Sequence, residues 1–241
     1  MKRWRSVAAA ASFLFASVGA QAATVTLTNI FGTWFDPNPA AVITSNTGAG
    51  TASTQVRWDA SGYDFVAAAS ASAVVPPSPS ASFVIGDFSH VNFPVFSAIS
   101  EIKLKITADI DVDGSNVGNR SFVFRFLHDE TPNGDDPCAY GGANGVGVNV
   151  NGCADRVQVE FTDASDSFLI GSDLYTVNIF GFNAGGSVVS DFLTAERATN
   201  TAQLLANVTL RRDVTGVPVP GTWALAGLAL AVVAVQRRRA A

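Results

Sequence analysis

The sequence predicts an all-β protein, an antiparallel β-sandwich of jelly-roll-like form. Short segments of the 241-residue chain alternate apolar and polar residues with a period of two, the pattern of a strand with one buried face. Runs rich in Gly, Asn and Asp separate these segments, and nothing between the two chain ends keeps a helical period. Seventeen Phe and a single Met suit a rigid aromatic core.

The N-terminus has the three parts of a secretory signal peptide. Its positive charge comes from Lys2, Arg3 and Arg5, and residues 6–18 form an apolar run. Ala20-Gln21-Ala22 then supplies the small residues that signal peptidase requires. We expect cleavage after Ala22, with signal peptidase as a partner, so that the chain between its two ends is exported.

Residues 23–216 form the predicted β domain. Its strands are expected, in chain order, at 24–31, 54–58, 82–85, 101–113, 121–127, 156–161, 167–170, 174–182 and 202–211. Two stretches rich in Ala, Ser, Pro and Gly, 37–51 and 67–80, are predicted loops, of which the second could cover an edge strand.

The clearest strand covers residues 101–113. Its apolar positions share one face, namely Ile102, Leu104, Ile106, Ile110 and Val112. Residues 113–116 have turn chemistry, and the next segment, 121–127, places Phe122, Phe124 and Phe126 on one face. The two segments are therefore predicted to pair as a hairpin with a rather long loop.

Residues 217–241 have the layout of a membrane segment. A Pro-containing break at Val217, Pro218, Val219 and Pro220 precedes an apolar run at 223–235, and the run ends at Arg237, Arg238 and Arg239. As a helix the run spans about 20 Å, which is short for a bilayer core of about 30 Å. No polar residue interrupts 224–235, so an amphipathic helix of the soluble domain is the poorer interpretation. We expect membrane insertion, with the arginines on the cytoplasmic side.

The exported part is strongly acidic. Residues 23–216 contain nine basic residues against twenty acidic ones, a net charge of −11, whereas the whole chain has −5. An acidic surface does not attract phosphate backbones, so nucleic acid is excluded as a partner.

The two cysteines of the chain, Cys138 and Cys153, both lie in the exported part. An even number of cysteines in an oxidising compartment predicts a disulfide, which would close a loop rich in Gly and Asn. Metal binding by these thiols would need two further soft ligands nearby, so the disulfide is the better interpretation.

Asp109, Asp111 and Asp113 form an Asp-x-Asp-x-Asp-Gly run of the kind found in calcium loops. An EF-hand needs a Glu at the twelfth position, which is Arg120 here. The same run also fits a strand whose acidic side chains simply face water, and this is the interpretation we favour. No cofactor is required by the sequence, and calcium is the one candidate.

The chain has only two histidines, His90 and His128. Each could bind a metal or act as a general base. Pro and Asn follow both residues closely, which favours corner positions where the ring and the neighbouring Asn or Thr tie down loop backbone through hydrogen bonds.

The two ends of the chain resemble those of the PEP-CTERM proteins of Gram-negative bacteria. The valine, both prolines, the apolar segment and the arginine cluster match, whereas Val219 stands where the family has a glutamate. The resemblance implies recognition by a membrane protease of the exosortase type, cleavage near the Pro box, and passage from the inner membrane to the cell surface or extracellular matrix.

The body resembles the THxN group of these proteins, also called the choice-of-anchor K domain. Ser89-His90-Val91-Asn92 corresponds to the Thr-His-x-Asn box that names the group. Other matching pieces are residues 32–34, 57–58, His128 with 130–133, Cys138, 151–155, and Thr194 with Glu196. The resemblance covers roughly residues 24–211 and implies a surface-sorted β domain, without supplying catalytic residues.

The sequence therefore favours an exported structural or adhesive component of the bacterial surface matrix that is not an enzyme. One alternative is a carbohydrate- or calcium-binding lectin-like module for exopolysaccharide, with aromatic pairs such as Tyr63 with Phe65, or Trp34 with Phe35, stacking on sugars. A second is a glycan hydrolase that uses an acid pair such as Asp87 and Glu160. No sequence signature of a hydrolase elbow, a zinc protease or a phosphate loop occurs.

Overall fold

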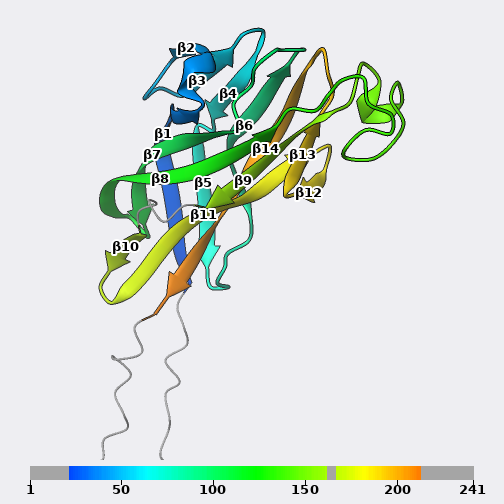
Figure 1. Ribbon diagram of the computed structural model, residues 1–241. Coiled ribbons are helices and arrows are strands. Elements are labelled where there is room, and N and C mark those ends of the chain that lie inside the picture. Colours follow the sequence, from blue (N-terminus) through cyan, green and yellow to red (C-terminus); the bar gives the residue numbers. More distant parts are fainter. Residues whose placement is uncertain (1–21, 162–166, 213–241) are drawn as a thin grey trace, which may run out of the picture.

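The computed structural model describes residues 22–161 and 167–212, and these form two curled antiparallel sheets packed face to face (Figure 1). The first sheet contains, in spatial order, β13 (Asp191–Thr194), β9 (Asp155–Phe161), β8 (Ser115–Asp129), β7 (Glu101–Val112), β1 (Ala23–Asn38) and β5 (Ser70–Val75). The second contains β10 (Ser167–Ile170), β11 (Asp173–Ala184), β14 (Ala198–Arg211), β6 (Phe83–Asn92), β4 (Ser61–Ala67), β3 (Ser53–Trp58) and β2 (Ile43–Thr47), with β12 (Ser187–Val189) paired to β11. The predicted all-β antiparallel sandwich is thereby confirmed.

Aromatic side chains join the two sheets. The ring of Phe88 on β6 lies 5.2 Å from that of Phe126 on β8, centroid to centroid, and 4.9 Å from Tyr63 on β4. Trp34 on β1 and Phe182 on β11 complete the group, at 6.3 and 5.4 Å from Phe88. All five are fully or almost fully buried, so this aromatic cluster fills the space between the sheets.

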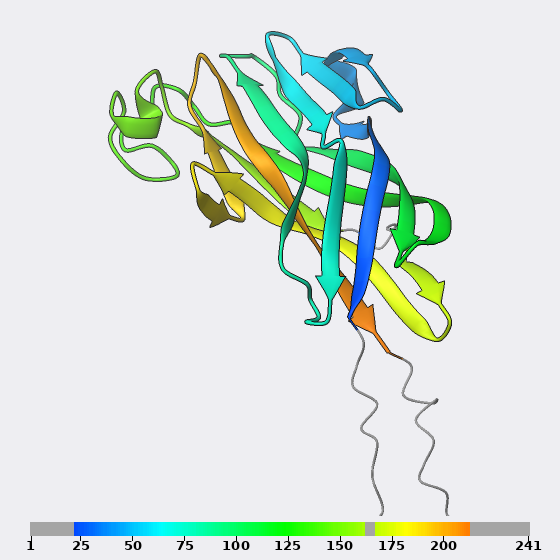
Figure 2. The same cartoon turned by 180° about the vertical axis from the view of Figure 1, so that it is seen from behind.

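The first and last strands leave the fold at the same end. The start of β1 and the end of β14 lie together at the lower end in Figure 1, and Figure 2 shows the same from behind. The loop between β8 and β9, which contains the short 3-10 helix η2 (Gly147–Asn149), lies at the opposite end. We call these the terminal pole and the loop pole.

The hairpin of β7 and β8 is confirmed, but its predicted long loop is wrong. Val112 pairs with Ser115, so only Asp113 and Gly114 lie between the strands. Both have positive φ, 51° and 82°, which is the backbone of a two-residue turn that favours Gly and tolerates Asp.

Each of the two predicted loops contains a strand. β2 lies within residues 37–51, and β5 within 67–80 pairs with the first half of β1, from Ala23 with Val75 to Thr28 with Ser70. β5 alternates exposed and buried residues, but the buried ones are two alanines and a valine. Side chains this small give a weak hydrophobic signal, and this explains why the composition favoured a loop.

The two segments expected to direct export and sorting fall largely outside the described residues. Residues 1–21 carry nearly all of the expected signal peptide, and 213–241 include the expected tail. In the part that the structure describes, no helix has the length and apolar character needed to cross a bilayer.

We predict that Phe88→Ala lowers the free energy of unfolding by about 3–5 kcal/mol, because it leaves a cavity at the centre of the aromatic cluster. Urea denaturation followed by tryptophan fluorescence measures the change. Phe96→Ala is the matched control, since Phe96 is fully exposed, and its effect should stay within about 0.5 kcal/mol. Equal effects of the two substitutions would contradict the central role of Phe88.

Candidate functional site: a buried histidine and carboxylate cluster

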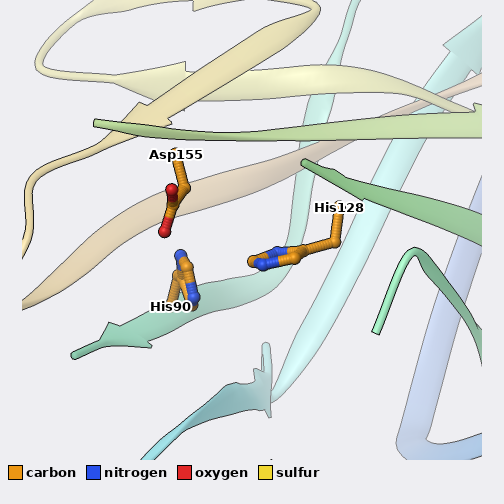
Figure 3. Close-up of side chains that lie close together, drawn as sticks. All are labelled: His90, His128 and Asp155. Atoms are coloured by element: carbon orange, nitrogen blue, oxygen red, sulfur yellow. The ribbon is translucent and has the colours of Figure 1, made fainter. Parts of the chain in front are cut away.

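Three side chains from both sheets converge near the loop pole. His90 comes from β6, His128 from β8 and Asp155 from the start of β9, and Figure 3 shows them pointing toward one another. One nitrogen or oxygen of each lies within 4.8 Å of the others. All three side chains are buried. We call them the central triad.

The proton of His90 can be placed from its hydrogen bonds. The Thr194 hydroxyl donates to the main-chain carbonyl of Asp155 at 3.3 Å, so its oxygen is left to accept from Nδ1 of His90 at 2.8 Å. This puts the proton on Nδ1 and a lone pair on Nε2. Nε2 is buried and has no hydrogen-bond partner among residues 22–161 and 167–212.

His128 lies between a phenol and a carboxyl group. Its Nδ1 is 2.6 Å from the Tyr63 hydroxyl, and its Nε2 is 3.3 Å from Oε2 of Glu130. The His90 and His128 rings are perpendicular, with centroids 5.1 Å apart. The indole of Trp58, at 5.3 Å from His128, closes the apolar side of the site.

Asp155 is anchored through only one of its two oxygens. Oδ1 accepts the backbone N–H of Thr131 at 2.7 Å and lies 3.2 Å from the Thr131 hydroxyl. Oδ2 is buried and lacks a hydrogen-bond partner within the described chain. Two unpartnered atoms, a ring nitrogen and a carboxylate oxygen, are therefore present in one buried site.

Further carboxyl groups surround Asp155. One oxygen each of Glu130, Asp155 and Glu196 lies within 4.8 Å of the others. Glu196 is fully buried, and its oxygens make no hydrogen bond of normal geometry in the described residues, although the side chains of Asn133 and Asp155 lie close enough to oppose the rise in its pKa that burial causes. No described lysine or arginine forms an ion pair with any of the three. The site thus concentrates acidic groups without a described lysine or arginine in ion-pair contact, although the charge of the more distant Arg197 opposes the rise in the pKa of Glu196.

Burial shifts every titratable group of the site toward its neutral form. It lowers the pKa of His128 to about 4 and, together with the charge of His128, takes the pKa of His90 well below 6.5. Burial raises the pKa of Glu130 to about 7, and burial with the charge of Glu130 raises the pKa of Asp155 to about 7. At neutral pH both imidazoles are therefore uncharged and carry a lone pair.

The disulfide loop covers this end of the sandwich. The sulfur atoms of Cys138 and Cys153 are 2.02 Å apart, so the expected disulfide is present. Asn149 donates to the carbonyl of Gly141 and accepts from the N–H of Ala154, and this fixes the chain just before Asp155. The staple thereby helps to hold Asp155 in the site.

The expectation that the histidines occupy loop corners is wrong. Both lie within strands, and their rings contact the side chains of Thr194 and Tyr63 instead of loop backbone. The neighbouring Asn92 and Thr131 do donate to backbone carbonyls, as expected. Of the Ser89-His90-Val91-Asn92 box, His90 and Asn92 point inward, and Asn92 donates to the Thr194 carbonyl at 3.1 Å. Ser89 faces outward and contacts the Thr201 hydroxyl.

The three aspartates proposed for calcium lie toward the terminal pole. Asp109 accepts from the amides of Asn29 and Asn119, Asp111 from the N–H of Gly114, and Asp113 from the N–H of Thr24. They are not among the described groups of three ligand atoms within 4.8 Å. Calcium binding there stays a prediction.

The residues named for the lectin and hydrolase alternatives are placed unfavourably. Tyr63, Phe65 and Trp34 are buried in the core, and Phe35 is half-buried. Asp87 on β6 is exposed on one sheet, whereas Glu160 on β9 belongs to the other sheet and pairs with Arg125. They do not form an acid pair across one site.

Sequence reasoning did not assign Asp155, Glu130 or Glu196 to a site. All three belong to the pieces that carry the THxN resemblance, and this was the only signal that could have grouped them with the histidines. No protein-family model and no curated protein matches the chain. The chemistry of the site therefore rests on its geometry.

We predict that the His128 ring titrates with a midpoint at about pH 4 instead of near 6.5. The unfolded chain takes up this proton near 6.5, so the contribution of His128 to stability is present above that pH and is lost as the pH falls toward 4. NMR of the chelator-treated protein follows both rings, and His90→Gln assigns them. In urea, where the chain is unfolded, both rings should titrate near pH 6.5. A midpoint near pH 6.5 for the His128 ring in the folded protein would contradict the prediction.

We predict that replacing Cys138 and Cys153 together by Ser lowers the free energy of unfolding by about 3 kcal/mol, the value expected for a 15-residue loop. Urea denaturation provides the measurement. Reductant should destabilise the parent protein to the same extent and leave the double variant unchanged. A parent protein that is insensitive to reductant would show that the loop does not depend on the disulfide.

Proposed function

We propose that the chain is an exported surface protein of a Gram-negative bacterium, of the PEP-CTERM sorting type and the THxN or choice-of-anchor K group. Its jelly-roll-like sandwich serves as a structural or adhesive unit of the extracellular matrix. Signal peptidase removes the N-terminus, an exosortase-like protease processes the tail, and the membrane holds the C-terminal helix only in transit. Exopolysaccharide is the candidate partner in the matrix.

The observation that carries the proposal is the position of the two described ends. Both leave the sandwich at the terminal pole, and the disulfide loop occupies the loop pole (Figures 1 and 2). β14 alone contains 14 residues, so the two poles are about 40 Å apart at about 3.3 Å per residue. A tail held in a membrane at the terminal pole would direct the loop pole outward.

The burial of the central triad supports a role without catalysis. A catalytic acid or base must come within hydrogen-bonding distance of its substrate. His90 and Asp155 have no exposed surface, and His128 is 5% exposed, so a polymeric substrate does not reach them. The disulfide and the large aromatic core instead favour a durable module outside the cell.

We predict that the protein recovered from the cell surface begins at Ala23 and has lost the residues after the Pro box. Mass spectrometry of the intact protein measures both ends and the Cys138–Cys153 bond. Val219→Glu restores the acidic residue of the family box and should increase the processed fraction, whereas Pro218→Ala with Pro220→Ala should decrease it. Full-length protein that stays in the inner membrane would show that the tail is a permanent anchor and would overturn the proposal.

A further inference from the structure

We propose that the central triad of His90, His128 and Asp155 binds a divalent transition-metal cation of the zinc type. The inference is independent of the proposed function, because it concerns the interior of the sandwich and not its sorting. It also differs from the calcium hypothesis, which concerns exposed aspartates near the other pole.

The first support is the tautomer of His90. Histidine ligands of metals commonly donate the proton of one ring nitrogen to a neighbouring acceptor and coordinate through the other nitrogen. His90 meets this description, since Nδ1 donates to Thr194 and the lone pair of Nε2 is buried without a donor. A buried polar atom left unpaired is costly, and a cation at Nε2 would remove that cost.

The second support is Asp155. Thr131 holds Oδ1 and leaves Oδ2 unpartnered within the described residues. In Figure 3 the carboxyl group points at the imidazole of His90. A nitrogen lone pair and an anionic oxygen that face one site repel each other unless a proton or a cation lies between them.

His128 supplies the third donor. Coordination through Nε2 places its proton on Nδ1, from which the Tyr63 oxygen accepts at 2.6 Å. The cation would then replace the contact of Nε2 with Glu130, now 3.3 Å. Glu130 and Glu196, which lie beside Asp155, are the candidates for a fourth ligand.

The charge of the site calls for a cation. Three carboxyl groups lie within 4.8 Å of one another, and no described lysine or arginine pairs with them. Two neutral imidazoles add no positive charge. A divalent ion would therefore offset two of the three negative charges when the carboxyl groups are ionised.

The donor types select the class of metal. Calcium and magnesium prefer sites made of oxygen only, whereas imidazole with carboxylate suits zinc and its neighbours. Both cysteines are in the disulfide, so thiolate ligands are excluded. Zinc bonds of about 2.0–2.2 Å in tetrahedral geometry place the ligand atoms about 3.3–3.6 Å apart. This spacing is compatible with ligand atoms that all lie within 4.8 Å of one another.

The test uses the full-length chain in mild detergent, without a polyhistidine tag and freed of metal by a chelator. Zinc chloride is titrated by calorimetry while NMR follows the two imidazoles. We expect one zinc per chain, shifts of both ring signals and a higher melting temperature. Because the chain contains only two histidines, the unsubstituted protein answers the question even where a variant fails to fold.

Matched variants locate the site. Asp155→Asn and His90→Gln each remove a ligand and should weaken zinc binding at least about 10-fold. Thr194→Val removes the hydrogen-bond partner of Nδ1 of His90 and should weaken zinc binding about 10- to 100-fold. Asp111→Asn, an exposed acidic residue, should leave it unchanged. The proposal is overturned if zinc leaves both imidazole signals unshifted or if no zinc binds at millimolar concentration. It is also overturned if Asp111→Asn weakens zinc binding as much as Asp155→Asn and His90→Gln do. Calcium that binds with the same stoichiometry and competes with zinc would also overturn it.

Discussion

The stack of Phe88 on Phe126 is the contact on which the rest of the molecule depends. It joins β6 of one sheet to β8 of the other, with ring centroids 5.2 Å apart. Because alternate residues of a strand face the same side, the inward positions that follow on these strands are His90 and His128. Their rings are 5.1 Å apart, nearly the spacing of the phenylalanines. The apolar core thus sets the distance between the two imidazoles, and the polar site continues the same interface.

Period-two patterning identified most strands, because the burial of alternate residues is a local property that the sequence carries directly. β7 follows the pattern along its whole length. β5 was missed because the residues on its buried face are small, and the two-residue turn at Asp113 was missed because its tightness depends on backbone angles.

The site was harder to predict. Which strands lie opposite one another is decided by sheet pairing, so His90 and Asp155, 65 positions apart, come together through the fold and not through any spacing.

The loop pole shows how the sandwich tolerates so polar an interior. The Thr194 hydroxyl contacts Nδ1 of His90 and the main-chain carbonyl of Asp155, and Thr131 holds the Asp155 carboxyl group through its backbone N–H and its hydroxyl. Asn92 and Asn149 connect the surrounding backbone, and the disulfide limits the motion of the loop above. Several polar atoms of the triad and its neighbours nevertheless have no hydrogen-bond partner in the described residues, among them Nε2 of His90, Oδ2 of Asp155 and both oxygens of Glu196, and this concentration sets the loop pole apart from an ordinary core.

The direction in which β14 leaves the sandwich also has a mechanical meaning. A protein held by its C-terminal end receives any pull at Arg211, along the axis of this strand. β14 is not an edge strand, since β11 and β6 flank it on its two sides. A pull in that direction must slide β14 past both neighbours at once, and it loads many backbone hydrogen bonds together instead of opening them one after another. If residues 213–241 carry the proposed sorting tail, the strand that precedes them is thus well placed to carry a tensile load.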